Sequence, residues 1–197
     1  MQKRTKKKAL LLTLGAVMLV AVSVLSTIAF LKSSDSVNNT FTVGKVEITL
    51  DEAKVSEYGV VDATASSRVK ANVYKLIPGH YYVKDPTVHF AADSEESYLF
   101  VKVENGLSAI EAESKTIESQ IAANGWTALT GETGVYYKKV NANTTNAAID
   151  YAVFGSFTLA EDAEVSSYSN AAINVTAYGI QADGFDTAED AWENGEF

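Results

Sequence analysis

The chain of 197 residues contains no cysteine and only two histidines and two prolines. Without cysteine the protein has neither disulfide bonds nor a thiolate that could attack a substrate or bind a metal. His80 and His89 do not form an H-E-x-x-H pair, and the sequence has no G-x-S-x-G elbow and no glycine-rich phosphate loop. These absences argue against the common hydrolases and nucleotide-binding enzymes. We therefore expect no catalytic residues and no enzymatic activity.

Acidic residues are missing from the first 29 positions. All 25 Asp and Glu residues come later in the chain, whereas 5 of the 16 Lys and Arg residues lie within these positions. Removal of this segment would leave 11 basic residues against 25 acidic ones, a net charge of −14 compared with −9 for the whole chain. A strongly negative protein repels nucleic acid and anionic lipid surfaces. We therefore expect no nucleic-acid partner, and membrane contact only through the leader.

The cationic start is followed by an uncharged, mostly apolar run, Ala9–Leu31, and then by a polar stretch. This order is typical of a secretory signal peptide. Thr27 and Ala29 fit the small-residue pattern that precedes a cleavage site, here at Phe30. The sequence thus predicts a signal peptide over residues 1–29 and a secreted protein of the extracellular matrix or cell surface. An uncleaved anchor is the alternative, because about 20 apolar residues suffice to span a bilayer.

Alternation of apolar and polar side chains dominates the rest of the chain. In residues 42–51, Val46, Ile48 and Leu50 share one face, and polar residues share the other, as in a half-buried strand. Further runs rich in Val, Ile, Thr, Tyr and Phe also predict strands. These runs are Lys70–Ile77, Thr87–Ala91, Tyr98–Glu104, Val135–Val140, Tyr151–Leu159 and Ala172–Ile180.

Helical patterns are few. Apolar residues recur along one side of Glu111–Asn124, and Gly125 follows as a plausible C-terminal stop. A short C-terminal helix is predicted to begin at Asp186 or Thr187, which can cap it, and to run through Trp192.

Turn and loop residues separate the predicted strands. Pro78-Gly79 predicts a turn, and residues 54–69 predict a long loop. Roughly eight short strands with one inserted helix are typical of an antiparallel β-sandwich. We therefore expect a mainly β domain over residues 40–197, a sandwich of jelly-roll type, preceded by a mature N-terminal segment over residues 30–39.

Two segments carry a resemblance to a known family. They are Asn39–Ile48, directly after the leader, and Pro78–Val88, which reads PGHYYVKDPTV. Together with Tyr98–Val103 and the closing segment Thr176–Trp192, they resemble proteins with the SipW-dependent type of signal peptide. That group includes TasA-type biofilm matrix proteins and camelysin-like surface proteins. The resemblance implies a jelly-roll domain, cleavage by a SipW-type signal peptidase, and a role at the cell surface or in the biofilm matrix.

The resemblance to TasA-like fibres also implies that the freed N-terminal segment completes the sheet of a neighbouring subunit. An extended segment that docks on an open sheet edge gains a row of main-chain hydrogen bonds, and its side chains set the register. Residues 30–39 are the expected donor, with Phe30, Leu31 and Val37 as the pocket-filling side chains. The partners would be other copies of the chain or other matrix proteins. The acceptor edge is not identifiable from the sequence.

Two other functions remain open at this stage. A camelysin-type surface metallopeptidase would need His80 and His89 to converge on a zinc ion. A monomeric adhesin or ligand-binding module would present an acidic concavity or an exposed aromatic patch. The aromatic side chains available for such a patch would otherwise cover the sheets; they are Tyr81, Tyr82, Tyr98, Phe100, Tyr136 and Tyr137.

One group of carboxylates is a candidate calcium site. Asp183, Asp186, Glu189 and Asp190 crowd around the predicted start of the last helix. Oxygen ligands in a loop before a helix can bind calcium at the millimolar concentrations found outside cells. The helix dipole also favours carboxylates at this position without a metal. Apart from the zinc that the metallopeptidase alternative would require, calcium is the one cofactor that the sequence leaves open.

Overall fold

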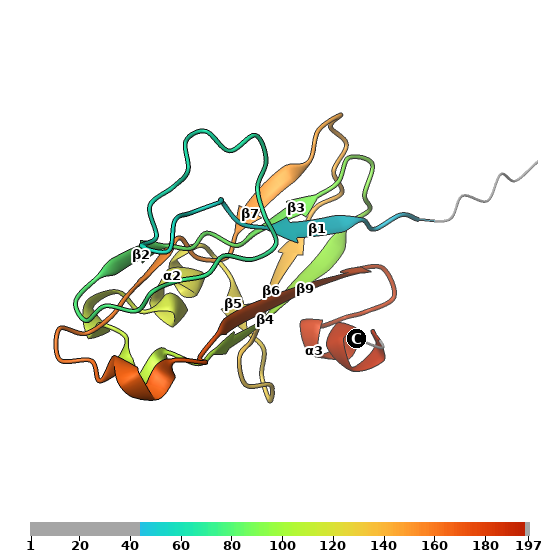
Figure 1. Cartoon of the computed structure of the whole chain (residues 1–197). Helices are drawn as coiled ribbons and strands as arrows, with labels where there is room; N and C mark the ends of the chain where they lie inside the picture. Colours follow the sequence, from blue (N-terminus) through green and yellow to red (C-terminus); the bar gives the residue numbers. More distant parts are fainter. Residues whose placement is uncertain (1–43, 196–197) are drawn as a thin grey trace, which may run out of the picture. The chain divides into compact units, whose positions relative to one another are not determined.

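The computed structural model describes residues 44–195 (Figure 1). The chain divides after Thr42 into two units, and all described residues belong to the second unit. The residues predicted for signal-peptide cleavage and strand donation lie outside the described part; they are Thr27, Ala29, Phe30, Leu31 and Val37. From Gly44 to Gly195, no helix combines the length and the apolar character needed to cross a membrane.

Strands dominate this unit, which confirms the mainly β architecture predicted from the alternation. Every ladder is antiparallel, and the sheet orders are β1-β3-β7, β2-β8 and β5-β6-β4-β9. The strands are β1 (Ile48–Asp51), β2 (Tyr81–Val83), β3 (Thr87–Phe90), β4 (Ser97–Asn105), β5 (Thr127–Ala128), β6 (Val135–Val140), β7 (Ile149–Ala152), β8 (Ser156–Thr158) and β9 (Ile173–Gln181).

The long central strand β4 contributes to two separate cores. Leu99, Val101 and Val103 join the main core, which also contains buried side chains of β2, β3 and β8. Tyr98 and Phe100 point to the opposite face, where a second buried cluster forms. Successive side chains of a strand alternate between its two faces, so one strand can serve both cores. The strand predicted at Tyr98–Glu104 is confirmed.

The C-terminal helix α3 (Ala188–Asn194) covers this second cluster. The Thr187 side chain accepts a hydrogen bond from the Asp190 amide, so the predicted start is confirmed, whereas the helix runs two residues beyond the predicted end at Trp192. The Trp192 ring lies 5.2 Å from the Phe100 ring, measured between centroids. Because Phe100 is fully buried, this part of the aromatic set belongs to a core and not to an exposed patch.

The inserted helix α2 (Ile117–Ala123) is shorter than the predicted Glu111–Asn124. Two 3-10 turns, Ser108–Ile110 and Glu113–Lys115, precede it. The Thr116 side chain caps its first turn by accepting a hydrogen bond from the Ser119 amide. The buried Glu111 carboxylate accepts from the Ile117 amide instead of belonging to the helix. The predicted start was therefore wrong.

The predicted strand Tyr151–Leu159 is interrupted, because β7 ends at Ala152 and β8 begins at Ser156. Side chains on or just after α2 take over the main-chain groups at this break. The Val153 carbonyl accepts from Asn124, and the Gly155 amide donates to Gln120. Side-chain hydrogen bonds can replace ladder bonds in this way, so an apolar run alone does not reveal the break.

Candidate strand-binding groove

Residues 70–77 are extended and alternate like a strand, but they do not pair as one. Asn72, Tyr74 and Leu76 are half-buried, whereas the residues between them are exposed, with Val73 at 83%. Of the amides in this segment, that of Lys75 donates to the Glu57 carbonyl, and that of Ile77 donates to the Tyr82 hydroxyl. Among the described residues the segment has no ladder partner. The prediction of a strand at Lys70–Ile77 is therefore wrong, because the segment pairs with no other strand among the described residues.

Strand β9 supplies a second open edge. It pairs with β4 along its whole length, and among residues 44–195 it has no partner strand on its other side. Near its C-terminal end, the core face of β9 at Gly179 lies against Val46 and Ile48, at the entry to β1. Beyond Asp51 the chain leaves β1 for the loop 54–69. Among residues 44–195, the N-terminal half of β9 thus has no strand paired along its outer edge.

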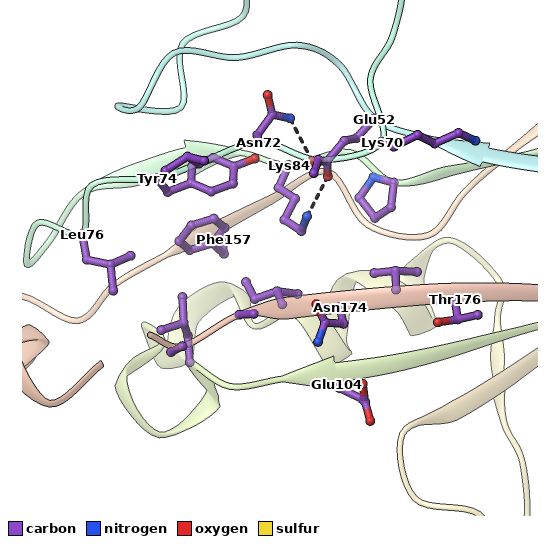
Figure 2. A pocket seen from close by; sticks show the side chains of 18 of the residues that line it. Glu52, Lys70, Asn72, Tyr74, Leu76, Lys84, Glu104, Phe157, Asn174 and Thr176 are labelled. Carbon is purple, nitrogen blue, oxygen red and sulfur yellow. Dashed lines mark hydrogen bonds and ion pairs between the residues drawn. The ribbon is translucent and has the colours of Figure 1, made fainter. Parts of the chain in front are cut away.

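A groove of about 1080 Å³ lies between these two edges. Residues 70–74 and Leu76 line one side, and residues 171–177 line the other. Figure 2 shows Tyr74 and Leu76 on the upper side and Asn174 on the strand below. A strand rises about 3.3 Å per residue, so the edge over residues 171–177 is roughly 23 Å long in extended form. The groove thus has the dimensions of one extended segment of about seven residues.

One end of this groove is apolar and aromatic. Leu76 and Phe157 lie there together (Figure 2), with further lining by Leu107, Val165 and Tyr168. Phe157 is stacked on the core ring of Tyr82, with a centroid distance of 4.6 Å and an interplanar angle of 11°. The Tyr74 ring meets Phe157 edge-on at 5.3 Å. Rings fixed in this way form a rigid wall suited to aliphatic or aromatic side chains.

The other end of the groove holds a buried ion pair. The Lys84 ammonium lies 2.6 Å from the Glu52 carboxylate, and the two side chains are 11% and 5% exposed. Asn72 donates to the other carboxylate oxygen at 2.9 Å. Figure 2 shows Lys84 directed from the upper layer into the space above β9. An ammonium has three N–H donors, and within residues 44–195 Glu52 is the one acceptor in hydrogen-bond range of this group.

Arg68 anchors the start of the unpaired segment to the sheet. Its guanidinium binds Asp51 at 2.5 Å and Asp85 at 2.9 Å, and it also donates to the hydroxyl of Thr87. A planar guanidinium can hold several acceptors in fixed directions. These contacts connect the long loop that precedes Lys70 to β1 and to the start of β3. They therefore determine where the groove wall begins.

His89 joins the same polar network. Its two ring nitrogens lie 2.8 Å from Asp51 and 2.6 Å from Asp150. Burial alone would lower the pKa of His89, but the hydrogen bonds and charges of the two carboxylates raise it above its usual value. In return, His89 and Arg68 outweigh the effect of burial and lower the pKa of Asp51. His89, Asp51, Asp150 and Arg68 thus form a local charge network in which these groups bind one another.

The two histidines have different surroundings. His80 lies 3.0 Å from the Tyr58 carbonyl oxygen and contacts the edge of the Tyr82 ring, whereas His89 binds two carboxylates. In the part of the chain that the structure describes, no three His, Asp or Glu side chains are arranged to hold a metal ion. The geometry thus offers no support for a zinc centre at these residues.

Within residues 44–195, the carboxylates near α3 likewise do not form a group of three that could hold a metal ion. Asp183, Asp186 and Asp190 are exposed, and the Asp190 amide completes the helix cap. The carboxylate of Glu189 has a lowered pKa, caused by hydrogen bonds from its own backbone and from Thr130. Calcium binding at these residues remains a prediction from the sequence.

Comparisons with known proteins find no match, either to a family model, to a curated protein or to a solved structure. The relation to SipW-dependent proteins therefore remains a resemblance of the sequence segments named above.

The ion pair at the polar end of the groove was not among the predicted site residues, although the sequence contains a signal for it. The alternation through Val46, Ile48 and Leu50 continues to Glu52, which places a carboxylate on the buried face of that strand. Lys84 likewise follows the buried Tyr82 by two residues. A charged residue that falls on a buried face needs a partner of opposite charge. Two such residues in one chain could have predicted the ion pair.

Proposed function

We propose that this protein is an exported, non-enzymatic structural protein of the cell surface or biofilm matrix, and that its copies assemble by strand addition in the groove between residues 70–76 and β9. The observation that carries the proposal is an open groove bordered by two main-chain edges that lack ladder partners among residues 44–195. Such edges favour the pairing of a further strand, which gains main-chain hydrogen bonds on entry.

The proposal includes a jelly-roll interpretation of the sheets. The strands β1, β2, β3 and β8 share the main core with β4 and β9, as in a two-layer sandwich. The groove then corresponds to a strand position that the described part of the chain leaves open. An added strand at this position would complete the sandwich and cover the core side chains near Phe157.

The occupant that we propose is the segment 30–39 of a second copy. Leu31 and Val37 are six residues apart, so both would face the core from one extended strand. The seven residues from Leu31 to Val37 also match the length of the groove edge. While the leader is attached, this segment would be held at the membrane or the export machinery. Cleavage before Phe30 by a SipW-type signal peptidase would therefore trigger assembly.

A deletion tests this proposal. The exported protein without Phe30–Val37 should remain folded by circular dichroism and should stay monomeric, whereas the intact exported protein should form fibres visible by electron microscopy. As a matched groove variant, Val175→Arg in the intact protein should also prevent fibres while the fold persists by circular dichroism, because Val175 lines the groove from β9. Tyr81→Arg, on an exposed side chain outside the groove, should not. Fibres from the truncated protein would refute the donor role.

A monomeric surface adhesin or ligand-binding module is the second candidate function. The rigid ring wall around Phe157 and the polar end at Lys84 would also suit an extended ligand with one apolar and one polar end. This candidate predicts that the cleaved protein stays monomeric at high concentration in analytical ultracentrifugation. Concentration-dependent assembly that requires residues 30–37 would instead support the structural role.

A further inference from the structure

We infer that the entering strand runs antiparallel to residues 70–76 and parallel to β9, with an aliphatic side chain at the Leu76 end and a hydrogen-bond acceptor against Lys84. This inference rests on the proposed function and adds the direction, the register and the residue that selects the strand. Its basis is the difference between the two ends of the groove.

The inward residues along the upper edge define three successive positions. Leu76 marks the apolar end, Tyr74 the middle and Asn72 the polar end, because these three alternate residues are half-buried. A paired strand would present its own alternate side chains opposite these positions. The middle position is aromatic, since Tyr74 packs on Phe157 and its hydroxyl already donates to the Val83 carbonyl. Because its one O–H donor is already engaged, Tyr74 itself offers no hydrogen bond to an entering carboxylate.

The polar position has donors to offer. Of the three N–H groups of the Lys84 ammonium, one is directed to Glu52, as described above. Both carboxylate oxygens of Glu52 are already engaged, by Lys84 and by Asn72. An entering strand would remove water from the remaining N–H groups of Lys84. Buried donors of a charged group are costly when they lack an acceptor, so Lys84 favours a strand that supplies one at this position.

The segment Leu31–Val37 meets these requirements in one direction only. With Leu31 opposite Leu76, Ser33 lies opposite Tyr74, Asp35 lies opposite Asn72 beside Lys84, and Val37 reaches the end near Leu50. In the reverse direction, Val37 lies opposite Leu76. Asp35 then lies opposite Tyr74, among aromatic rings. Burial of a carboxylate without a hydrogen-bonding partner is strongly unfavourable. The donor segment therefore enters with its N-terminal end at Leu76.

Engineered disulfides test the direction, and the absence of native cysteine makes each link unambiguous. Exported protein that carries Leu31→Cys is mixed with protein that carries Leu76→Cys, and separately with protein that carries Lys70→Cys, before oxidation. Mass spectrometry of the digested assemblies should find the 31–76 link and not the 31–70 link. Protein with Tyr81→Cys, outside the groove, serves as the matched control for random collisions.

The outcomes separate the two levels of the argument. A 31–70 link without a 31–76 link would overturn the direction, while strand addition would stand. Fibres that contain neither link would overturn the register as well as the groove as acceptor. Loss of fibres in the Leu76→Cys protein alone would point to damage of the wall. Lys32→Cys, on the opposite face of the strand, is then paired with the exposed Lys75→Cys and separately with the exposed Ala71→Cys; the 32–75 link is expected, and a 32–71 link in its place would overturn the direction.

Substitutions of Asp35 test the role of Lys84. Asp35→Leu should weaken strand binding at least about tenfold, because it leaves the Lys84 donors without an acceptor, whereas Asp35→Asn keeps an acceptor oxygen and should assemble nearly as well as the native protein. Ser34→Leu, on the opposite face of the strand, is the matched control. The critical concentration for fibre formation measures the effect. Assembly of Asp35→Leu at the native concentration would overturn the selection by Lys84.

Discussion

The ammonium of Lys84 and the carboxylate of Glu52 are 2.6 Å apart in the wall of the groove, and both side chains are nearly buried. The two residues come from distant parts of the chain, just after β2 and just after β1. Their pairing joins the end of β1 to the chain between β2 and β3. Since buried charges must be matched, this pair fixes the geometry of the groove as well as its polarity.

Removal of one member of this pair should destabilise the protein. Lys84→Met would leave the Glu52 carboxylate buried without its cation and should lower the free energy of unfolding by roughly 3–5 kcal/mol. The double variant Glu52→Leu with Lys84→Met should recover much of this loss, because it removes both charges. Urea denaturation of the exported protein measures both effects. A double variant that is as unstable as Lys84→Met would contradict this account.

The stacked rings of Tyr82 and Phe157 are the second structural element that we expect to be sensitive. These residues are direct partners in the β2–β8 ladder, and both are almost fully buried. Phe157→Ala should lower the free energy of unfolding by about 3–5 kcal/mol, through lost burial and the cavity that remains. Tyr81→Ala, on the neighbouring exposed residue, should change it by no more than about 0.5 kcal/mol. Equal losses for the two variants would show that the ring pair is not part of the core.

The strands that the sequence predicts well are those whose faces meet different environments. In β4, alternate residues face two different cores, and in β9 the residues from Ile173 to Ala177 alternate between half-buried and exposed. Alternation of this kind reflects burial and is visible in the sequence. The start of α3 was also predictable, because Thr187 is a local capping signal.

What could not be predicted depends on contacts between distant residues. Residues 70–77 alternate correctly, yet their ladder partner is missing in the described part of the chain, and no local pattern reports pairing. The break after Ala152 arises from side chains such as Gln120, far away in sequence. The groove itself requires two such edges to lie opposite each other. The resemblance to TasA-like fibres suggested its occupant as a hypothesis but did not indicate where the segment would bind.

Gly59 should tolerate substitution poorly, because its backbone lies in the left-handed region and presses against a core residue. Its φ is +73°, and an added Cβ would lie 2.7 Å from the Tyr82 Cα. Gly131 has a φ of +86° but open space around the same position, so it is the matched control. Both alanine variants should lose about 1–2 kcal/mol through the backbone conformation, and Gly59→Ala should lose about 1–3 kcal/mol more through overpacking. Equal losses in urea denaturation would exclude the steric effect.

His89 should make the stability of the protein depend on pH above about pH 6.5, the ordinary pKa of histidine. The two carboxylates raise its pKa in the folded state above the ordinary value of 6.5. A group whose pKa is raised by folding binds its proton more tightly in the folded state, so its contribution is complete below about pH 6.5 and is lost as the pH rises through the folded pKa. The midpoint of thermal unfolding should therefore fall across this interval in the native protein.

The variant His89→Gln should remove most of this fall, because glutamine carries no proton that could titrate there. The native chain has no cysteine, so few other groups change charge between about pH 6.5 and 9. His80→Gln is the control, since His80 contacts a carbonyl oxygen and an aromatic ring but no carboxylate, and it should keep the native slope. At acidic pH, Asp51 acts in the opposite sense, because folding lowers its pKa. Its contribution to stability is present above its ordinary pKa of 3.8. This contribution is lost as the pH falls through the pKa of the folded state. A His89→Gln protein with an unchanged slope above pH 6.5 would show that the network of His89, Asp51 and Asp150 does not contribute to stability.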